Sequence, residues 1–261
     1  MMAAAHTLAS VLLWLILCST SPVFFVGALV VWLVTVPFDR RLRILHLYSS
    51  AWASFYTYIF PFWRIAIRGR ERIRNDRAYV LVSNHQSWLD ILVLFQLYRH
   101  FKWVSKASVF SAPFLGWNMR LNRYIAIRRG DAHDAQRMMT DCIATLASGS
   151  SIMMFPEGTR SLDGHLRPFK HGAFTLAKEQ AVPVLPIVLD GTLEALPKHG
   201  LVLRSAPDIV VQALDPIDPE AFPTAEALRD HVRAVMELKL HELQAEREGG
   251  GPPTEAIAAT A

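Results

Sequence analysis

Residues 78–90 read Ala-Tyr-Val-Leu-Val-Ser-Asn-His-Gln-Ser-Trp-Leu-Asp, and this stretch decides the fold class. Its first half is a short apolar run, typical of a strand that is covered on both faces. Its second half begins with Asn84 and His85 and leads into a helical pattern from Trp88. A buried strand followed by a polar loop and a helix is the repeating unit of an α/β fold. We therefore expect a largely parallel sheet flanked by helices.

The same unit recurs along the chain. Strands are expected at Ala78–Ser83, Tyr124–Arg128, Ser151–Phe155, Val184–Leu189 and Ile209–Ala213, and helices at Trp88–Arg99, Ala132–Ala147, Ala173–Glu179 and Ala225–Glu246. Each of the first three strands runs directly into polar residues. Ligand sites in open α/β sheets form outside the carboxyl ends of the strands, so we expect these three polar groups to converge.

The N-terminal region has the composition of a membrane anchor. No charged residue occurs between Thr7 and Phe38, a run of 32 residues, whereas about 20 suffice to cross a bilayer as a helix. A secretory signal peptide would begin with positive residues, so we expect an anchor that is retained. Either one tilted span around Val23–Val36 or a hairpin that turns near Pro22 fits this run. The arginines that follow favour the cytoplasmic side and anionic headgroups; they are Arg40, Arg41 and Arg43.

A second apolar stretch, Leu45–Ile67, is rich in Trp and Tyr. It predicts an interfacial or shallowly inserted helix, with an aromatic-rich core helix as the alternative. We divide the chain into membrane-anchoring segments (1–67), an α/β domain (68–248) and a disordered tail (249–261). The overall composition, 52% hydrophobic and 19% charged, excludes a disordered chain, and a net charge of +4 does not indicate a nucleic-acid partner.

The first polar group contains a possible catalytic base. Ser87 and Asp90 fit a capping box, which places His85 in the loop before the helix and turns Asp90 back toward it. A carboxylate beside an imidazole fixes its tautomer and stabilises the imidazolium that forms when it accepts a proton. The alternative is that Asp90 only caps the helix and His85 is an ordinary loop residue.

The other polar groups carry cations suited to a phosphate. In Pro156–Ser161, Gly158 permits close backbone approach and Arg160 can bind phosphate through two N–H groups. Glu157 can orient that arginine or accept from a substrate hydroxyl. Only one of Arg128 and Arg129 can face the shared edge, because neighbouring side chains on a strand point to opposite sides. Lys106 is a further cation, and a solvated charged turn is the alternative for each of these groups.

The sequence lacks the motifs of nucleotide hydrolases, serine hydrolases and metal-dependent enzymes. There is no Gly-rich phosphate loop, no G-x-S-x-G elbow and no His/Cys/Asp cluster at metal-ligand spacing. Two cysteines are too few for a disulfide framework.

These polar groups resemble the motifs of the glycerolipid acyltransferase family, whose best-known member is 1-acyl-sn-glycerol-3-phosphate acyltransferase. Asn84–Asp90 is similar to its N-H-x-x-x-x-D motif, and Phe155–Ser161 matches F-P-E-G-T-R-S. Ala126–Arg129 resembles the middle motif, with Arg128 in place of the usual aspartate, and Val182–Pro186 resembles V-P-x-x-P. The resemblance covers roughly residues 68–215, and four motifs in the same order exclude a chance match. Lesser matches are Lys106 and Phe169–Gly172.

The resemblance implies a mechanism without a metal or other cofactor. His85, oriented by Asp90, takes the proton of a lysophospholipid hydroxyl, and the oxygen attacks the thioester of acyl-CoA or acyl carrier protein. The acceptor's phosphate and glycerol are then bound by six residues, namely Arg129, Glu157, Gly158, Thr159, Arg160 and Lys106.

The expected activity is acylation of the 2-hydroxyl of 1-acyl-glycerol-3-phosphate to phosphatidic acid, in or on a membrane. The catalytic domain is expected on the cytoplasmic side, at the cytoplasmic membrane if the protein is bacterial. The same motifs serve other acceptors: glycerol-3-phosphate, another lysophospholipid or a lyso-ornithine lipid. A non-catalytic membrane scaffold that has kept the fold is a further alternative. The donor, the acyl-chain preference, the oxyanion donor and the oligomeric state stay open.

Overall fold

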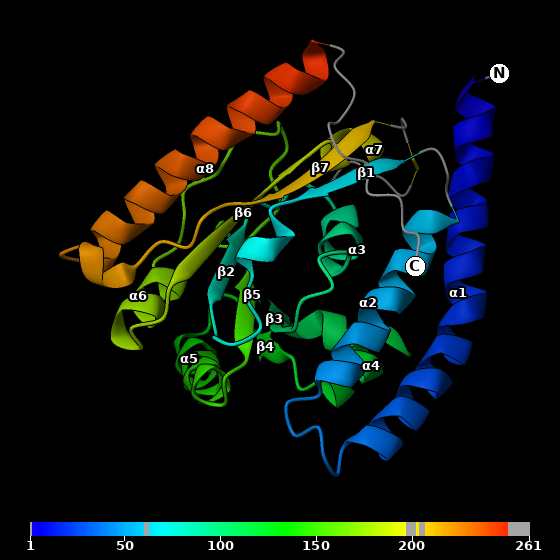
Figure 1. The fold of residues 1–261 in the computed structure, drawn as a ribbon. Coiled ribbons are helices and arrows are strands. Elements are labelled where there is room, and N and C mark those ends of the chain that lie inside the picture. Colours follow the sequence, from blue (N-terminus) through cyan, green and yellow to red (C-terminus); the bar gives the residue numbers. More distant parts are fainter. Residues whose placement is uncertain (1, 60–62, 197–201, 204–206, 250–261) are drawn as a thin grey trace.

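The computed structural model describes residues 2–59, 63–196, 202–203 and 207–249, and within them a sheet lies between two layers of helices (Figure 1). The order across the sheet is β1-β7-β6-β2-β5-β3-β4. The strands are β1 (Arg64–Arg68), β2 (Val80–Ser83), β3 (Phe101–Lys106), β4 (Ile125–Ile127), β5 (Ser151–Met154), β6 (Val184–Asp190) and β7 (Asp208–Ala213). Each neighbouring pair is parallel except β6 and β7. The expectation of a largely parallel α/β sheet is confirmed.

The alternation of side chains along β2 explains its continuous apolar sequence. Val80 and Val82 belong to a core beneath α5 (Ala132–Ala147), α6 (Gly172–Glu179) and α8 (Ala225–Glu248). Leu81 belongs to the opposite core, with α3 (Leu89–Phe95). Successive strand residues face opposite sides of a sheet, so a strand covered on both sides is apolar throughout.

Two strands were not predicted. β1 overlaps the end of Leu45–Ile67, where a helix was expected, but helix α2 ends at Tyr58 and residues 64–68 form a strand paired with β7. The expected boundary between residues 67 and 68 therefore falls inside a strand of the sheet. β3 escaped prediction because Lys102 interrupts its apolar pattern, although its ammonium group is buried and donates to the carbonyl of Asn122 at 2.7 Å.

The N-terminal region forms one helix, α1 (Met2–Thr35), that continues through Pro22. The hairpin with a turn near Pro22 is therefore wrong. The hydroxyl of Thr20 donates to the carbonyl of Ile16 at 2.7 Å and also lies 3.0 Å from the hydroxyl of Tyr56. These contacts lie two residues before Pro22, which removes one N–H donor from the helix. Residues 6–35 are long and apolar enough to cross a membrane by length and composition.

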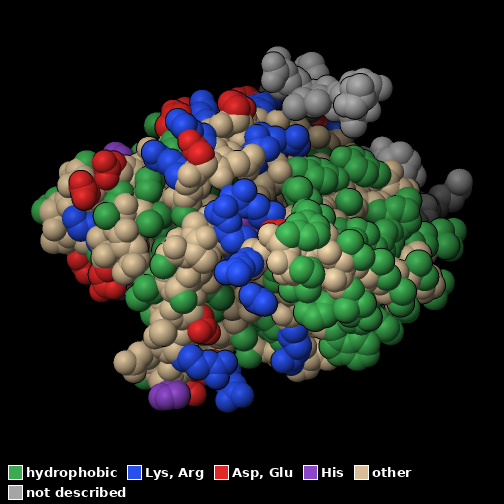
Figure 2. Space-filling view, turned by 60° about the horizontal axis from the view of Figure 1, so that its bottom comes forward, with side chains coloured by type: hydrophobic (Ala, Val, Ile, Leu, Met, Phe, Trp, Pro, Cys, Tyr) green, Lys and Arg blue, Asp and Glu red, His purple; other side chains and the backbone are tan. Residues whose placement is uncertain are grey.

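The chain turns after α1 and enters α2 (Arg43–Tyr58), which lies between α1 and the sheet domain (Figure 1). Trp52 and Tyr56 are buried in this position, so the core-helix alternative describes α2 better than an interfacial helix. α1 packs on α2 and on α4 (Leu115–Leu121), and its outer side chains form a broad exposed apolar face (Figure 2). The tail expected after residue 249 lies outside the described residues.

Candidate active site

Asn84 fixes the loop that follows β2. Its side-chain amide donates to the carbonyl of Leu189 at 2.8 Å, and its side-chain oxygen accepts from the N–H of the same residue at 2.7 Å. This paired contact replaces a backbone ladder between the end of β2 and β6. The next residue, His85, is thereby held at the carboxyl edge of the sheet.

Asp90 is fully buried and accepts four hydrogen bonds. Oδ2 accepts from His85 Nδ1 at 2.7 Å and from the backbone N–H groups of Gln86 and Ser87 at 2.6 and 2.9 Å. Oδ1 accepts from the hydroxyl of Thr192. The bond to Ser87 N–H is the return contact that a capping box predicts. Four donors from two segments of the chain fix the orientation of this carboxylate.

The remaining nitrogen of His85 is available to a substrate. The imidazole stacks on Phe155, with ring centroids 4.0 Å apart and planes 12° from parallel. In the neutral imidazole whose Nδ1 donates to Asp90, the lone pair is on Nε2. Nε2 makes no hydrogen bond within the described part of the chain, and the side chain is 13% exposed. The arrangement is that of an oriented base with one open nitrogen.

Glu157 has different partners from those that the sequence indicated. Oε1 accepts from the backbone N–H of His85 at 2.9 Å, and Oε2 accepts from the N–H of Arg167 at 3.1 Å. Burial raises the pKa of Glu157 to about 7, although both of these hydrogen bonds act in the opposite direction. The carboxylate therefore joins the loop after β2 to the loop after β5, and it does not reach out to Arg160.

Gly158 and Arg160 lie beside this junction. Gly158 has φ +70°, and a Cβ there would lie 2.7 Å from Cε of Lys170. The Lys170 side chain thus covers the glycine, a contact that only the weak match at Phe169–Gly172 indicated. The Arg160 guanidinium lies 5.0 Å from the ring centroid of Trp88. Burial lowers the pKa of Arg160 while the charge of Asp90 raises it, so the arginine lies within electrostatic reach of the His85–Asp90 pair.

Thr159, Lys106 and Arg129 are less closely tied to His85. Thr159 is half-buried in the loop after β5. Lys106 ends β3, and Arg129 follows β4 by two residues; both side chains are exposed. β4 is three strands from β2, roughly 14 Å at about 4.8 Å per strand. These two cations share the edge with His85 but do not contact it.

Thr192 was missed by the sequence reasoning. It follows β6 and Gly191 and begins the short helix α7 (Thr192–Ala195). The same rule that marked the first three strands applies here, because β6 also runs into polar residues. Within the described ranges, no group of three His, Cys, Asp or Glu side chains is placed to hold a metal ion.

Comparison with known proteins identifies the family to which the chain belongs. A family model described as Acyltransferase matches residues 64–190, from β1 to the end of β6. A 1-acyl-sn-glycerol-3-phosphate acyltransferase of Limnanthes douglasii is 31% identical over 85% of this chain and 78% of its own length. The chain belongs to the 1-acyl-sn-glycerol-3-phosphate acyltransferase family.

Other members of the 1-acyl-sn-glycerol-3-phosphate acyltransferase family are longer. A chloroplastic member from Brassica napus is 39% identical over 69% of this chain, which spans 52% of its length. A member from Chlamydomonas reinhardtii is 37% identical over 83% of this chain and 66% of its own. The crystal structure of the 1-acyl-sn-glycerophosphate acyltransferase PlsC from Thermotoga maritima superposes with a TM-score of 0.78 at 27% identity, covering 92% of this chain and 98% of that one. Because the superposition covers 92% of this chain, it includes both the α1–α2 pair and the sheet domain.

Proposed function

We propose that this protein transfers a fatty acyl group from a thioester donor to the 2-hydroxyl of 1-acyl-glycerol-3-phosphate, giving phosphatidic acid. The observation that carries the proposal is the His85–Asp90 pair, whose histidine Nε2 is open and whose carboxylate lies within electrostatic reach of Arg160. Nε2 takes the hydroxyl proton, the oxygen attacks the thioester carbonyl, and the carbon–sulfur bond breaks. The proton then passes to the departing thiolate of acyl-CoA or acyl carrier protein. No cofactor is needed in this sequence of steps.

The cations along the edge are assigned to the acceptor. Arg160 lies within electrostatic reach of Asp90, and Lys106 and Arg129 stand two and three strands away from β2. Arginine and lysine side chains at one edge attract a phosphate and hold it through charge-assisted hydrogen bonds. Gly158 and Thr159 line the approach, while Glu157 holds the two loops in register. Together these residues position the glycerol so that its hydroxyl meets His85.

The membrane supplies the acceptor. The outer face of α1 exposes Val23, Val26, Leu33 and Val34 among other apolar side chains. A contiguous exposed apolar face usually marks a contact with a membrane or with a partner protein. We assign it to the bilayer, with the catalytic domain on the cytoplasmic side. Since α1 lies along the domain, the active site stays close to the lipid surface (Figure 1).

An acceptor panel tests the proposed specificity. Purified protein in detergent, supplied with oleoyl-CoA, is expected to acylate lysophosphatidate faster than lysophosphatidylcholine, glycerol-3-phosphate or a lyso-ornithine lipid. The reason is that the cations recognise a phosphate monoester on an acceptor that already carries one chain. The products are separated and quantified by mass spectrometry. A higher kcat/KM for any other acceptor would contradict the assignment of lysophosphatidate.

A further inference from the structure

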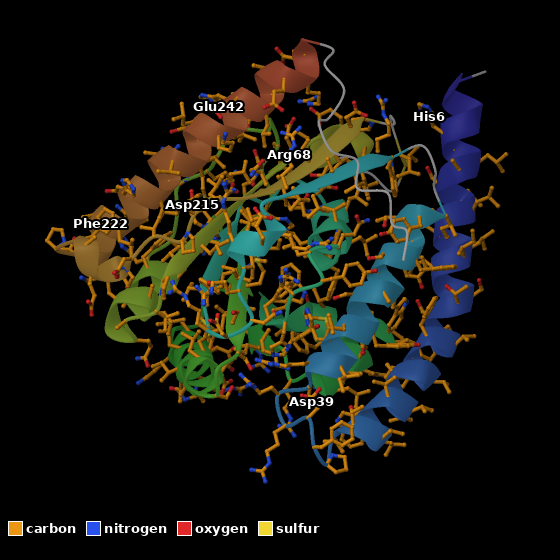
Figure 3. All side chains as sticks on the ribbon, in the orientation of Figure 1. His6, Asp39, Arg68, Asp215, Phe222 and Glu242 are labelled. Atoms are coloured by element: carbon orange, nitrogen blue, oxygen red, sulfur yellow. The ribbon has the colours of Figure 1, made fainter. Side chains whose placement is uncertain are left out.

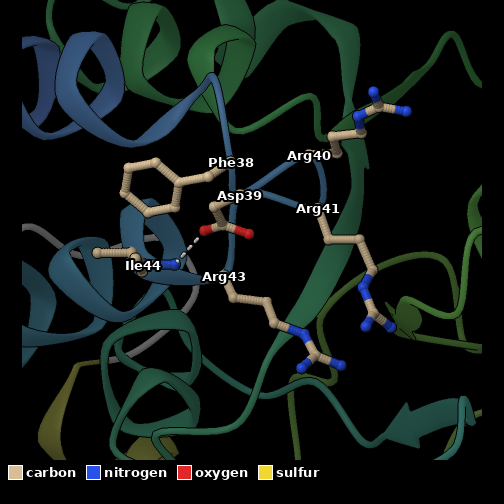
Figure 4. Close-up of a pocket in the computed structure, with 6 residues that line it drawn as sticks. All are labelled: Phe38, Asp39, Arg40, Arg41, Arg43 and Ile44. Atoms are coloured by element: carbon tan, nitrogen blue, oxygen red, sulfur yellow. Dashed lines mark hydrogen bonds between the residues drawn. The ribbon is translucent and has the colours of Figure 1, made fainter.

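The turn that joins α1 to α2 contains a cationic cavity near residues that precede β2 and β5, whereas the residues assigned to acyl transfer follow the carboxyl ends of the strands. We call residues 38–44 the arginine turn. The cavity has a volume of about 440 Å³ and is lined by Phe38, Asp39, Arg40, Arg41, Arg43 and Ile44 (Figure 4). The carboxylate of Asp39 accepts from the N–H of Ile44 at 2.7 Å and so caps α2. None of the three arginines forms an ion pair within the described residues.

Two of these arginines are held in place by backbone carbonyls. Arg41 Nη1 donates to the carbonyl of Gly149 at 3.0 Å, and Arg43 Nη2 donates to that of Asn75 at 3.2 Å. Gly149 leaves room for this contact, because a Cβ there would lie 2.7 Å from Arg41 Nη1. Each guanidinium has five N–H donors, so most of them stay open. Arg43 Nε is buried and has no hydrogen-bond partner in the described structure, which is costly unless an acceptor binds.

The potential around the turn is positive. Burial lowers the pKa of the nearby His100 to about 3, and the charges of Lys102, Arg43 and Arg41 act in the same direction. The side chains that flank the cations are apolar and exposed, Phe38 by 68% and Ile44 by 43%. Figure 2 shows Lys and Arg side chains bordering the broad hydrophobic face. Cations beside exposed apolar side chains are typical of a protein surface at the level of lipid headgroups.

We propose that the arginine turn binds the phosphate of an anionic phospholipid headgroup, at a site separate from the acyl-transfer centre. The guanidinium groups bind the phosphate oxygens, and Phe38 and Ile44 enter the acyl region beside it. A free phosphate would use the same donors but would leave both apolar side chains in water. The proposal rests on the proposed membrane function, because it requires the apolar face of α1 to lie against the bilayer.

Vesicle binding of the full chain tests this site. Each Lys or Arg near an anionic surface contributes about 1 kcal/mol. The combined change Arg40→Gln, Arg41→Gln and Arg43→Gln is therefore expected to lower partitioning onto phosphatidylglycerol-containing vesicles by roughly a hundredfold. Partitioning onto pure phosphatidylcholine vesicles is expected to stay unchanged. Arg40→Gln alone, at an exposed side chain, gives a smaller loss and guards against misfolding of the combined variant.

Matched variants distinguish a specific phosphate-binding site from a nonspecific effect of the protein's net charge. Arg229→Gln, Arg233→Gln and Lys239→Gln change the net charge equally on α8, which lies across the molecule from Asp39; Figure 3 labels its Glu242. They are expected to bind vesicles like the unaltered protein. Replacing the three arginines of the turn by lysine keeps the positive charge but removes the planar guanidinium groups. This variant is expected to bind vesicles better than the triple glutamine variant but less well than the unaltered protein. Full restoration by lysine, or an equal loss in the α8 variant, would overturn the proposal.

The remaining outcomes separate this site from the proposed function. Failure to bind phosphatidylcholine vesicles would count against the membrane assignment, and failure of acyl transfer in detergent would count against the activity. Titration of the detergent-solubilised protein with inorganic phosphate distinguishes the ligand source. Binding of phosphate that the turn variants lose, with no gain from phosphatidylglycerol, would identify a soluble-anion site instead and overturn the lipid assignment.

A second, independent inference concerns Thr192. Its side chain is fully buried, and its hydroxyl donates to Oδ1 of Asp90, whose Oδ2 is engaged by His85. Gly191 (φ +88°) sets the turn that brings it there, and a Cβ at this glycine would lie 2.3 Å from the carbonyl oxygen of Asp208. We infer that Thr192 is a positioning residue that acts through Asp90 on His85 in the proposed transfer.

Substitution by valine and serine tests this role. Thr192→Val keeps the shape and removes the hydroxyl, and we expect kcat to fall about tenfold, the value of one hydrogen bond near 1.4 kcal/mol, with KM nearly unchanged. Thr192→Ser is expected to recover most of kcat. A valine variant with full kcat, or a serine variant as slow as valine, would overturn the inference. A His85→Ala sample with unchanged activity would instead contradict the proposed mechanism.

Discussion

The His85→Ala variant is expected to lose acyl transfer by roughly a hundredfold to ten-thousandfold, the usual contribution of a positioned general base. His85 is the residue whose Nδ1 is bound to Asp90 and whose Nε2 is open to a substrate. The rate is measured with lysophosphatidate and oleoyl-CoA in detergent, at saturating concentrations of both. We expect the effect to fall on kcat, because the proton is transferred only as the new bond forms.

Two further variants make this result interpretable. His85→Gln keeps most of the volume that stacks on Phe155 and is expected to be as inactive as alanine. His133→Ala removes an exposed imidazole at the start of α5 and is expected to transfer at the normal rate. Circular dichroism and thermal melting show whether each variant is folded. Folded His85 variants with normal kcat would refute the proposed role of this residue.

The Glu157→Gln variant is expected to lower transfer by about a hundredfold, the effect of a small displacement of reacting groups. A glutamine has one acceptor oxygen, whereas Glu157 uses one oxygen for His85 N–H and the other for Arg167 N–H. One of the two loops is therefore released. Glu237→Gln, in a half-buried ion pair with Arg233 on α8, is the matched control and is expected to have no effect on transfer.

The same variant should alter the pH dependence of stability. Burial raises the pKa of Glu157 from 4.5 to about 7, so between these values the folded protein binds more protons than the unfolded chain. The resulting stabilisation is fully present below about pH 4.5 and is lost as the pH rises through about 7, at most about 3 kcal/mol. Melting temperatures in detergent are expected to fall over this range less steeply for the variant. Equal slopes for the variant and the unaltered protein would contradict this account.

Short-range patterns in the sequence predicted the elements that build the site. The apolar run before Asn84 predicted β2, and the capping box predicted that Asp90 turns back toward His85. The prediction that residues 132–147 form a helix matches α5, since a capping aspartate precedes it and Gly149 follows its end. In each case the residues that set the structure lie within one or two turns of one another.

Contacts between distant segments could not be predicted in this way. β1 is a short strand between two arginines, and only its pairing with β7 makes it part of the sheet. α1 continues through Pro22, and the hydroxyl of Tyr56 in α2 lies within hydrogen-bond distance of Thr20 and Ser21 beside it. The sequence pattern before and after Pro22 is compatible with a turn, so the local sequence did not distinguish the two structures.

Local patterns in the sequence predicted the α/β class, the uncharged apolar N-terminal run and the approach of Asp90 to His85, because strand alternation and helix capping act over a few residues. The tertiary structure decided what surrounds that pair. Glu157 reaches His85 across 72 residues of sequence, and Thr192 reaches Asp90 across 102. Such contacts depend on the order of β2, β5 and β6 in the sheet, which follows from the packing of the whole core. No pattern of residues close together in the sequence predicts that order.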